Sequence, residues 1–469
     1  MSGAFLITGG RPLRGSVQAA GSKNAALPMM AAALLSDGPV VLEGVPWLTD
    51  VDTLGRVLGE LGVDVAWNVA VQEDSPGSRC QASQQARAIC QSAVEGRRLP
   101  LSAVDAAPFS DGAALCCLRL HVADTAPVRA RYELVCRMRA SFCVLGPLLA
   151  RRGRAVVPLP GGCRIGPRPV DLHLKGLAAL GADLTLAHGY VIARARRLRG
   201  ATIDLTGPAG CTVTGTANVL SAAVLARGET LLRGAACEPE IVDLGRLLCK
   251  MGARIDGLGT SIVRVRGVDA LDGARHRIIP DRIEAATLAM AVAATRGAAT
   301  ITGVDPGHLT AVLHRLADAG AGVASGADWI RIAAPQALRP CSISAEPYPG
   351  IPSDVQAQWT ALMTLASGRS VVIDRVFPQR FAHVPELARL GARIRLAAGA
   401  AVVDGVRQLG GATVTACDLR ASAALVLAGL AARGRTRIEH IHWLDRGYEA
   451  LDRKLVQLGA SVERLPPAT

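Results

Sequence analysis

One cysteine lies in a stretch whose residue types favour a reactive thiol. Cys163 follows Gly161 and Gly162 and precedes Arg164 and Arg168, within a run (160–173) that also holds three prolines. Glycine permits unusual turns and proline removes backbone donors, so this run is predicted to form a surface loop. The two arginines would favour the thiolate form. We therefore interpret Cys163 as a reactive residue, although free cysteines are more often buried and structural.

Basic side chains at helix starts could bind an anionic ligand. Lys23 lies in the stretch 21–28, which follows a predicted strand and begins an apolar helix. A helix N-terminus with a lysine attracts anions, whereas Ser22 beside it is also a typical helix cap. A lone arginine at such a place is more often a surface salt-bridge residue, so it is their recurrence that favours binding. Four arginines lie at helix starts or strand-to-helix junctions: Arg139, Arg380, Arg420 and Arg446.

A single carboxylate is a candidate general base. Asp354 follows the segment 349–353, which contains two prolines and a glycine, and precedes a predicted helix. In the first turn of that helix it could simply complement the helix dipole. The same position would lower its pKa and weaken it as a base, so a catalytic role requires compensating desolvation.

The elements that would position these residues repeat along the chain. Six times, a predicted helix ends at a glycine and a predicted strand follows. These glycines are Gly62, Gly181, Gly252, Gly320, Gly391 and Gly459, and the intervals between them are 119, 71, 68, 71 and 68 residues. A glycine at such a helix end is typical of the left-handed conformation. A second series (Gly38, Gly153, Gly228, Gly297, Gly368 and Gly434) ends a short apolar helix before an alternating strand. The spacing predicts six units of about 70 residues.

The first interval is longer than the others by about 50 residues, which places an insertion in unit two. The period is lost at about 72–117, so we predict an insertion of ~46 residues in a hairpin connection. Cys80, Cys90, Cys116 and Cys117 crowd into it, but the adjacent pair is poor geometry for a metal site. No metal is predicted.

Composition narrows the class of protein. Of 469 residues, 50% are hydrophobic and 19% charged, which indicates a globular chain long enough for two or more domains. Neither a signal peptide nor a membrane span is expected, and the default localisation is cytoplasmic. The net charge of +13 could indicate nucleic-acid binding. Because the arginines are spread out and aromatic residues make up only 3%, we favour anionic small molecules.

The Cys163 loop, the Lys23–Asn24 stretch, the six units and the segment 445–448 (Asp-Arg-Gly-Tyr) together resemble the UDP-N-acetylglucosamine 1-carboxyvinyltransferases, a branch of the enolpyruvyl transferase family. The resemblance covers about nine tenths of the chain. It implies an α/β fold of two inside-out barrel domains, each of three βαβαββ units. One domain would span 23–280, and the other 1–22 plus 281–469. Oligomeric state is left open, with a monomer as the default.

The resemblance also implies a reaction: transfer of the enolpyruvyl group of phosphoenolpyruvate to the 3′-hydroxyl of UDP-N-acetylglucosamine, with release of phosphate, at the start of peptidoglycan precursor synthesis. Cys163 would protonate C3 of phosphoenolpyruvate and could form a covalent adduct with it, and Asp354 would be the base. Acid, base and cationic clamps suffice, so no cofactor is expected. The phosphoenolpyruvate ligands would be Lys23, Asn24, Arg168, Arg380, Arg420 and Arg446. The UDP-sugar ligands would be Arg139, Arg168, Pro169, Val170, Asp171, Leu172, Gly210, Cys211, Thr212, Val213, Asp354 and Val376.

Several positions depart from the pattern of the relatives. Ala217 stands where many have glutamate, Cys237 where arginine is usual, and Trp443 where histidine is usual, while Pro378-Gln379 replaces Glu-Asn. Two alternatives therefore stay open. One is an enolpyruvyl transferase acting on another nucleotide or sugar nucleotide, and the other is a homologue that binds ligand without turnover.

Overall fold

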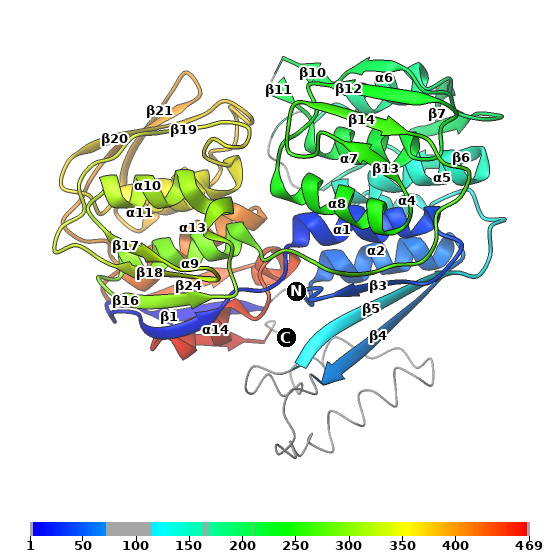
Figure 1. The fold of residues 1–469 in the computed structure, drawn as a ribbon. Coiled ribbons are helices and arrows are strands. Elements are labelled where there is room, and N and C mark those ends of the chain that lie inside the picture. Colours follow the sequence, from blue (N-terminus) through cyan, green and yellow to red (C-terminus); the bar gives the residue numbers. More distant parts are fainter. Residues whose placement is uncertain (1–2, 72–113, 163–165, 167, 209, 467–469) are drawn as a thin grey trace.

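The computed structural model describes residues 3–71, 114–162, 166, 168–208 and 210–466. Its helices and strands form two halves that lie side by side (Figure 1). The buried apolar residues of the first half lie within 25–278, and those of the second half join 5–19 to 283–460. Cys163, Arg164 and the segment 72–113 lie outside the described residues.

The first half alternates helices with short strands. Its helices are α1 (Lys23–Ala32), η1 (Ala33–Leu35), α2 (Thr49–Glu60), α4 (Tyr132–Val135), η3 (Arg139–Val144), α5 (Leu145–Arg152), α6 (Asp171–Ala179), α7 (Val213–Ala223) and α8 (Pro239–Lys250). Its strands are β3 (Val40–Glu43), β4 (Val63–Val71), β5 (Ala114–Val122), β6 (Arg154–Pro158), β7 (Asp183–Ala187), β8 (Tyr190–Arg194), β9 (Thr202–Asp204), β10 (Thr206–Gly207), β11 (Gly210–Cys211), β12 (Glu229–Arg233), β13 (Arg254–Asp256), β14 (Ile262–Arg266) and β15 (Arg275–Arg277).

The second half has the same alternation. Its helices are α9 (Arg282–Ala294), η4 (Pro306–Leu309), α10 (Thr310–Asp318), η5 (Ser353–Val355), α11 (Gln356–Met363), α12 (His383–Arg389), α13 (Leu419–Ala431), η6 (Ile441–Arg446) and α14 (Leu451–Gln457). Its strands are β1 (Ala4–Thr8), β2 (Arg14–Gln18), β16 (Ala298–Thr302), β17 (Gly322–Ser325), β18 (Trp329–Ala333), β19 (Ile343–Ala345), β20 (Arg369–Asp374), β21 (Arg393–Ala397), β22 (Ala400–Asp404), β23 (Thr413–Thr415), β24 (Arg435–Glu439) and β25 (Ser461–Leu465).

One sheet arrangement recurs throughout. Five four-stranded sheets, with orders β15-β3-β5-β4, β9-β12-β14-β13, β2-β16-β18-β17, β19-β20-β22-β21 and β23-β24-β1-β25, each have one parallel pair at an edge and antiparallel neighbours elsewhere. The sixth, β6-β8-β7, gains its parallel neighbour through a bridge between Arg129 and Val156. All six glycines of the first series have positive φ, from 79° to 108°, as their spacing predicted.

Three helices in each half are buried on nearly every side. They are α1, α5 and α7 in the first half and α9, α11 and α13 in the second, and all 13 residues of α9 are buried. Small and apolar residues all round such a helix let it pack inside a core, whereas α2, α8 and α10 bury only one face. The buried apolar residues fall into two clusters, one within 25–278 and one joining residues 5–19 to 283–460.

The chain crosses between the halves at two adjacent points. Strand β1 lies between β24 and β25, and β2 pairs with β16, so both N-terminal strands belong to the second half. At the crossing Gly21 forms a bridge with Pro280, and the Ser22 amide donates to the Ile279 carbonyl at 2.8 Å. A Cβ on Gly21 would lie 1.8 Å from the Gly44 carbonyl oxygen, so only glycine fits. This crossing places the start of α1 at the boundary between the halves.

The predicted hairpin around the insertion is confirmed, but its C-terminal boundary is wrong. Strands β4 and β5 pair antiparallel from Val63 with Val122 to Val71 with Ala114. Strand β5 therefore begins at Ala114, and Cys116 and Cys117 belong to it rather than to the insertion. The continuous ladder with β4 outweighs the irregular composition that suggested the later boundary. Cys80 and Cys90 lie outside the described residues.

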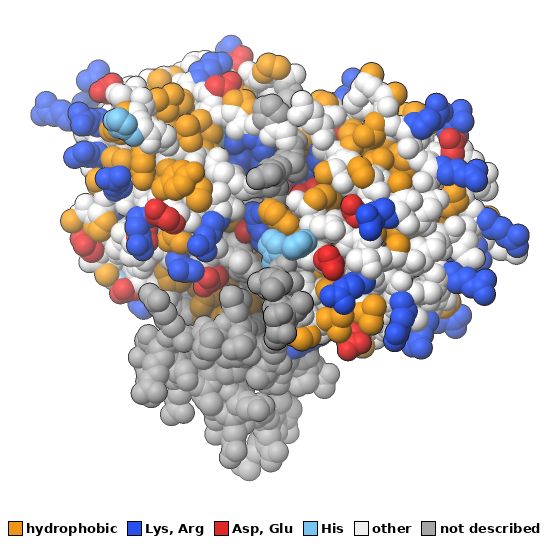
Figure 2. All heavy atoms as spheres, turned by 180° about the vertical axis from the view of Figure 1, so that it is seen from behind, with side chains coloured by type: hydrophobic (Ala, Val, Ile, Leu, Met, Phe, Trp, Pro, Cys, Tyr) orange, Lys and Arg blue, Asp and Glu red, His pale blue; other side chains and the backbone are white. Residues whose placement is uncertain are grey.

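The basic side chains are distributed over the surface. On the face shown in Figure 2, Lys and Arg side chains are spread over both halves rather than gathered in one patch. Within the described part of the chain, no helix combines the length and apolar character that crossing a membrane requires.

Candidate active site

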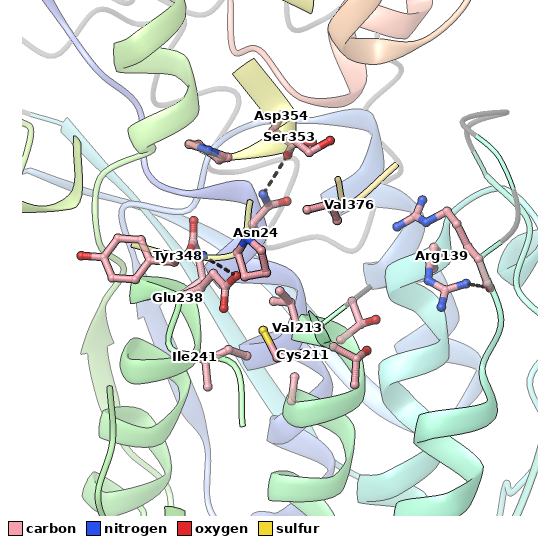
Figure 3. A pocket seen from close by; sticks show the side chains of 18 of the residues that line it. Asn24, Arg139, Cys211, Val213, Glu238, Ile241, Tyr348, Ser353, Asp354 and Val376 are labelled. Atoms are coloured by element: carbon pink, nitrogen blue, oxygen red, sulfur yellow. Dashed lines mark hydrogen bonds between the residues drawn. The ribbon is translucent and has the colours of Figure 1, made fainter. Parts of the chain in front are cut away.

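A cleft of about 380 Å³ lies between the halves and is lined by residues of both. In Figure 3, Arg139 stands on one side, Glu238 and Tyr348 on the other, and Asp354 beyond Asn24. Most residues predicted as ligands line it: Asn24, Arg139, Arg168, Pro169, Asp171, Leu172, Gly210, Cys211, Thr212, Val213, Asp354 and Val376. Five predicted ligands are not among the lining residues: Val170, which is the cap residue of α6, and the four basic residues Lys23, Arg380, Arg420 and Arg446.

Asp354 lies between two arginines in an arrangement we call the Asp354 triad. Arg380 donates from Nη1 to Oδ1 at 2.8 Å, and Arg420 donates from Nη2 to Oδ2 at 2.9 Å. Both arginines are buried, while 29% of the Asp354 side chain remains exposed. Arg380 follows strand β20, and Arg420 lies in the first turn of α13, so two successive units place their guanidinium groups beside Asp354 in η5.

The triad controls the pKa of its carboxylate. Burial alone would raise the pKa of Asp354, but Arg420 and Arg380 outweigh it and hold the pKa well below its usual range. With burial alone, the raised pKa would make Asp354 a stronger base, whereas the two arginines lower the pKa and make it a weaker one. In this arrangement Asp354 is ionised and is held mainly as a counterion.

A second carboxylate forms a similar arrangement, the Asp50 triad. Lys23 Nζ lies 2.6 Å from Asp50 Oδ2, and Arg446 Nε donates to Oδ1 at 2.8 Å. Lys23 and Asp50 come from the first half and Arg446 from η6 in the second, so this triad joins the halves. Burial would raise the pKa of Asp50, but Lys23 and Arg446 lower it.

Two adjacent residues at the start of α1 link the triads. Lys23 contacts Asp50, and Asn24 Nδ2 donates to Asp354 Oδ2 at 3.4 Å. Ser22 caps the helix by accepting from the Ala25 amide, so its expected structural role is confirmed. Each triad places two cationic side chains against one carboxylate, and basic groups of this kind favour an anionic ligand.

The opposite side of the cleft is also cationic. Arg139, the first residue of η3, donates to the backbone carbonyls of Arg168 and of Pro169, the latter at 2.7 Å. The Arg168 guanidinium stacks over the Phe377 ring at 5.4 Å, a contact between the halves. Arg139 thus holds the segment that precedes α6 against the cleft.

Three acidic residues of the cleft region were missed by sequence reasoning. Asp50 holds Lys23 and Arg446, Glu240 pairs with Arg282, and Glu238 lines the cleft. Asp50 looks like an ordinary first-turn acid of α2, so the sequence offers no signal for it. Glu238 and Glu240 flank Pro239 at the start of α8 and read as helix-start acids in the same way.

Comparisons with known proteins agree on one family. The EPSP synthase (3-phosphoshikimate 1-carboxyvinyltransferase) family model matches residues 7–110 and 120–455. The UDP-N-acetylglucosamine 1-carboxyvinyltransferase of Myxococcus xanthus (strain DK1622) is 46% identical over 460 residues, covering 98% of this chain and 99% of the relative. That of Koribacter versatilis (strain Ellin345) is 45% identical over 461 residues, covering 98% and 96%.

Solved structures share the fold. The enolpyruvyl transferase NikO from Streptomyces tendae superposes with a TM-score of 0.79 at 25% identity, covering all of both chains. EPSP synthase from Acinetobacter baumannii superposes with a TM-score of 0.67 at 16% identity, covering 98% of this chain and 99% of that one. With its two halves and the cleft between them, the chain belongs to the EPSP synthase family of enolpyruvyl transferases. Within that family, its similar curated relatives are UDP-N-acetylglucosamine 1-carboxyvinyltransferases.

Proposed function

We propose that this protein transfers the enolpyruvyl group of phosphoenolpyruvate to the 3′-hydroxyl of UDP-N-acetylglucosamine and releases phosphate. Near-complete coverage by relatives of that name supports this acceptor. The product would enter peptidoglycan precursor synthesis, and the reaction would take place in the cytoplasm. The domains would be 23–280 and 1–22 with 281–469, a division supported by the two apolar clusters.

The Asp354 triad is the observation that carries this proposal. Arg420 Nε and Nη1 and Arg380 Nε are buried and have no hydrogen-bond partner among the described residues. Buried guanidinium donors without partners are costly, and a second carboxylate would satisfy them. We assign this role to the carboxylate of phosphoenolpyruvate, which would share the arginines with Asp354. The phosphate would lie near Lys23, Arg446 and Arg168.

These contacts give Asp354 two successive roles. Before phosphoenolpyruvate binds, it neutralises Arg380 and Arg420. A substrate carboxylate that takes over part of their positive charge would raise the pKa of Asp354, because less positive charge would then stabilise its ionised form. With its pKa raised in this way, Asp354 would be a stronger base and would accept the proton of the sugar 3′-hydroxyl.

The remaining steps follow from the expected roles of the cleft residues. Cys163, which lies outside the described residues, would donate a proton to C3 of phosphoenolpyruvate and make C2 electrophilic. The sugar oxygen would attack C2, and the arginines would hold the carboxylate of the tetrahedral intermediate. Loss of phosphate from C2 and of a proton from C3 would restore the double bond.

One assay tests the proposal against its alternatives. Phosphate release is measured with phosphoenolpyruvate and one acceptor at a time: UDP-N-acetylglucosamine, other UDP-sugars, UMP or 3-phosphoshikimate. We expect release with UDP-N-acetylglucosamine at the highest kcat/KM. Faster release with another acceptor would favour a paralogue, a possibility raised by Ala217, which lines the cleft where many relatives have glutamate. Binding of both substrates without release would indicate a non-catalytic homologue.

A further inference from the structure

Glu238 presents an unused acceptor to the cleft. It immediately precedes α8, lines the cleft, and is only 7% exposed. Its Oε1 accepts from the Tyr348 amide at 3.4 Å, whereas its Oε2 is buried and has no hydrogen-bond partner among the described residues. Figure 3 shows its side chain beside Tyr348, facing the same space as Asn24. A buried polar atom without a partner needs an explanation, and a missing ligand is one.

Neither the fold nor a neighbouring cation uses this carboxylate fully. The Glu238 side chain makes no capping hydrogen bond to α8. The nearby guanidinium of Arg282 is taken by Glu240, to which it donates from Nε at 2.9 Å and from Nη2 at 3.2 Å. Burial raises the pKa of Glu238, with Arg282 only partly opposing this effect. Glu238 Oε2 can therefore accept a hydrogen bond from a ligand that enters the cleft.

The charge distribution restricts what that donor can be. Arg139 lies on the opposite side of the cleft (Figure 3), and Arg168 lines the same cleft; both suit the anionic parts of the substrates. Glu238 would repel a phosphate or a carboxylate. Neither proposed substrate carries a cationic group, so the donor would be an uncharged group, and a hexose has several hydroxyls. Asn24 lies between Glu238 and Asp354 (Figure 3), so a sugar whose reacting hydroxyl meets Asp354 would have other hydroxyls towards Glu238.

We propose that Glu238 Oε2 accepts a hydrogen bond from a second hydroxyl of the acceptor hexose, and so determines specificity for the sugar. This inference rests on the proposed function, because it takes a nucleotide sugar as the acceptor. One hydroxyl at Asp354 and another at Glu238 would fix the ring at two points. Such a site rejects a sugar that lacks the second hydroxyl, because the buried acceptor would then stay unpaired.

Binding measurements with matched ligands test the proposal. Dissociation constants are measured by calorimetry for UDP, UDP-N-acetylglucosamine and its 4-deoxy and 6-deoxy analogues, with wild-type protein, Glu238→Gln and Glu238→Ala. We expect Glu238→Ala to weaken UDP-N-acetylglucosamine binding roughly 10- to 100-fold, the effect of a hydrogen bond to a charged group. UDP binding should not change. Wild-type protein should reject one deoxy analogue by a similar factor, and Glu238→Ala should bind that analogue and the parent sugar almost equally.

Three outcomes in the variants would overturn the inference on Glu238 alone. Equal weakening of UDP and UDP-N-acetylglucosamine would assign Glu238 to the nucleotide or to the fold. Unchanged binding of the parent sugar would exclude a contact with it. Equal discrimination between parent and deoxy analogues in wild type and variant would show that Glu238 does not contact those hydroxyls. Wild-type phosphate release, measured in parallel, reports separately on the proposed function, and wild-type protein that binds no UDP-N-acetylglucosamine would overturn both.

Discussion

Replacing Asp354 by Asn separates its two roles. The substitution removes the charge that faces Arg380 and Arg420, both of which are buried. Removing one partner of a buried ion pair typically costs ~3–5 kcal/mol. Because 29% of the Asp354 side chain is exposed and asparagine keeps one acceptor oxygen, we expect the lower end, ~3 kcal/mol. Turnover should fall at least ~10²-fold, since an amide cannot accept the hydroxyl proton.

Phosphoenolpyruvate should rescue the stability of this variant but not its activity. Its carboxylate would supply the charge that the two arginines have lost, so it should raise the thermal midpoint of Asp354→Asn more than that of the wild type. Thermal unfolding with and without phosphoenolpyruvate, together with phosphate release, measures both effects. Asp404→Asn is the matched control, because Asp404 meets Arg369 at 2.6 Å on the surface and should affect neither measurement. Near wild-type kcat in Asp354→Asn, or equal stabilisation of both proteins, would refute the reasoning.

Three further predictions concern the thiol, the insertion and acid stability. Fosfomycin should alkylate Cys163 alone among the twelve cysteines, as mass spectrometry can show, and Cys163→Ser should lose at least ~10²-fold in rate; labelling elsewhere with Cys163 untouched would contradict its assignment. Replacing residues 72–113 by an Asn-Gly turn between β4 and β5 should leave a cooperatively folding, active protein, because loop entropy changes by only ~0.6 kcal/mol per doubling of length; loss of folding or of phosphate release would make the insertion a working part. Burial lowers the pKa of His173 to about 3, so below pH ~6.5 the unfolded chain binds a proton that the folded one does not, and stability should fall with acidification by up to ~1.4 kcal/mol per pH unit. The free energy of unfolding, measured with denaturant between pH 7 and 5, should change less with pH in His173→Gln than in the wild type. An unchanged pH dependence would exclude this residue as the cause.

The repeat was predictable because local physics dictates it. A glycine at a helix end such as Gly252 has the positive φ that its position requires, whatever the rest of the chain does. The hairpin around the insertion was predictable for a similar reason, since the strands on either side keep their alternation. The boundary at Ala114 was not, because pairing with β4 decides where β5 begins.

The pairings within the cleft depend on tertiary structure. Asp354, Arg380 and Arg420 were each identified as candidates, but their union in one triad follows from the packing of successive units. Asp50 and Glu238 gave no signal, because an acid near the start of a helix is common and usually complements the dipole. Only the fold shows that one contacts two predicted ligands and that the other leaves an acceptor unpaired.

The placement of β1 and β2 in the second half has a consequence during synthesis on the ribosome. These strands emerge first, yet β24 and β25, the partner strands of β1, are translated more than 400 residues later. At ~5–20 residues per second, β1 waits roughly 20–90 s before its sheet can form. Meanwhile residues 23–280 can already collapse around their own apolar cluster. Until then Ala4–Thr8 has no partner strands in its own sheet, so an unpaired strand that could pair elsewhere is exposed during synthesis.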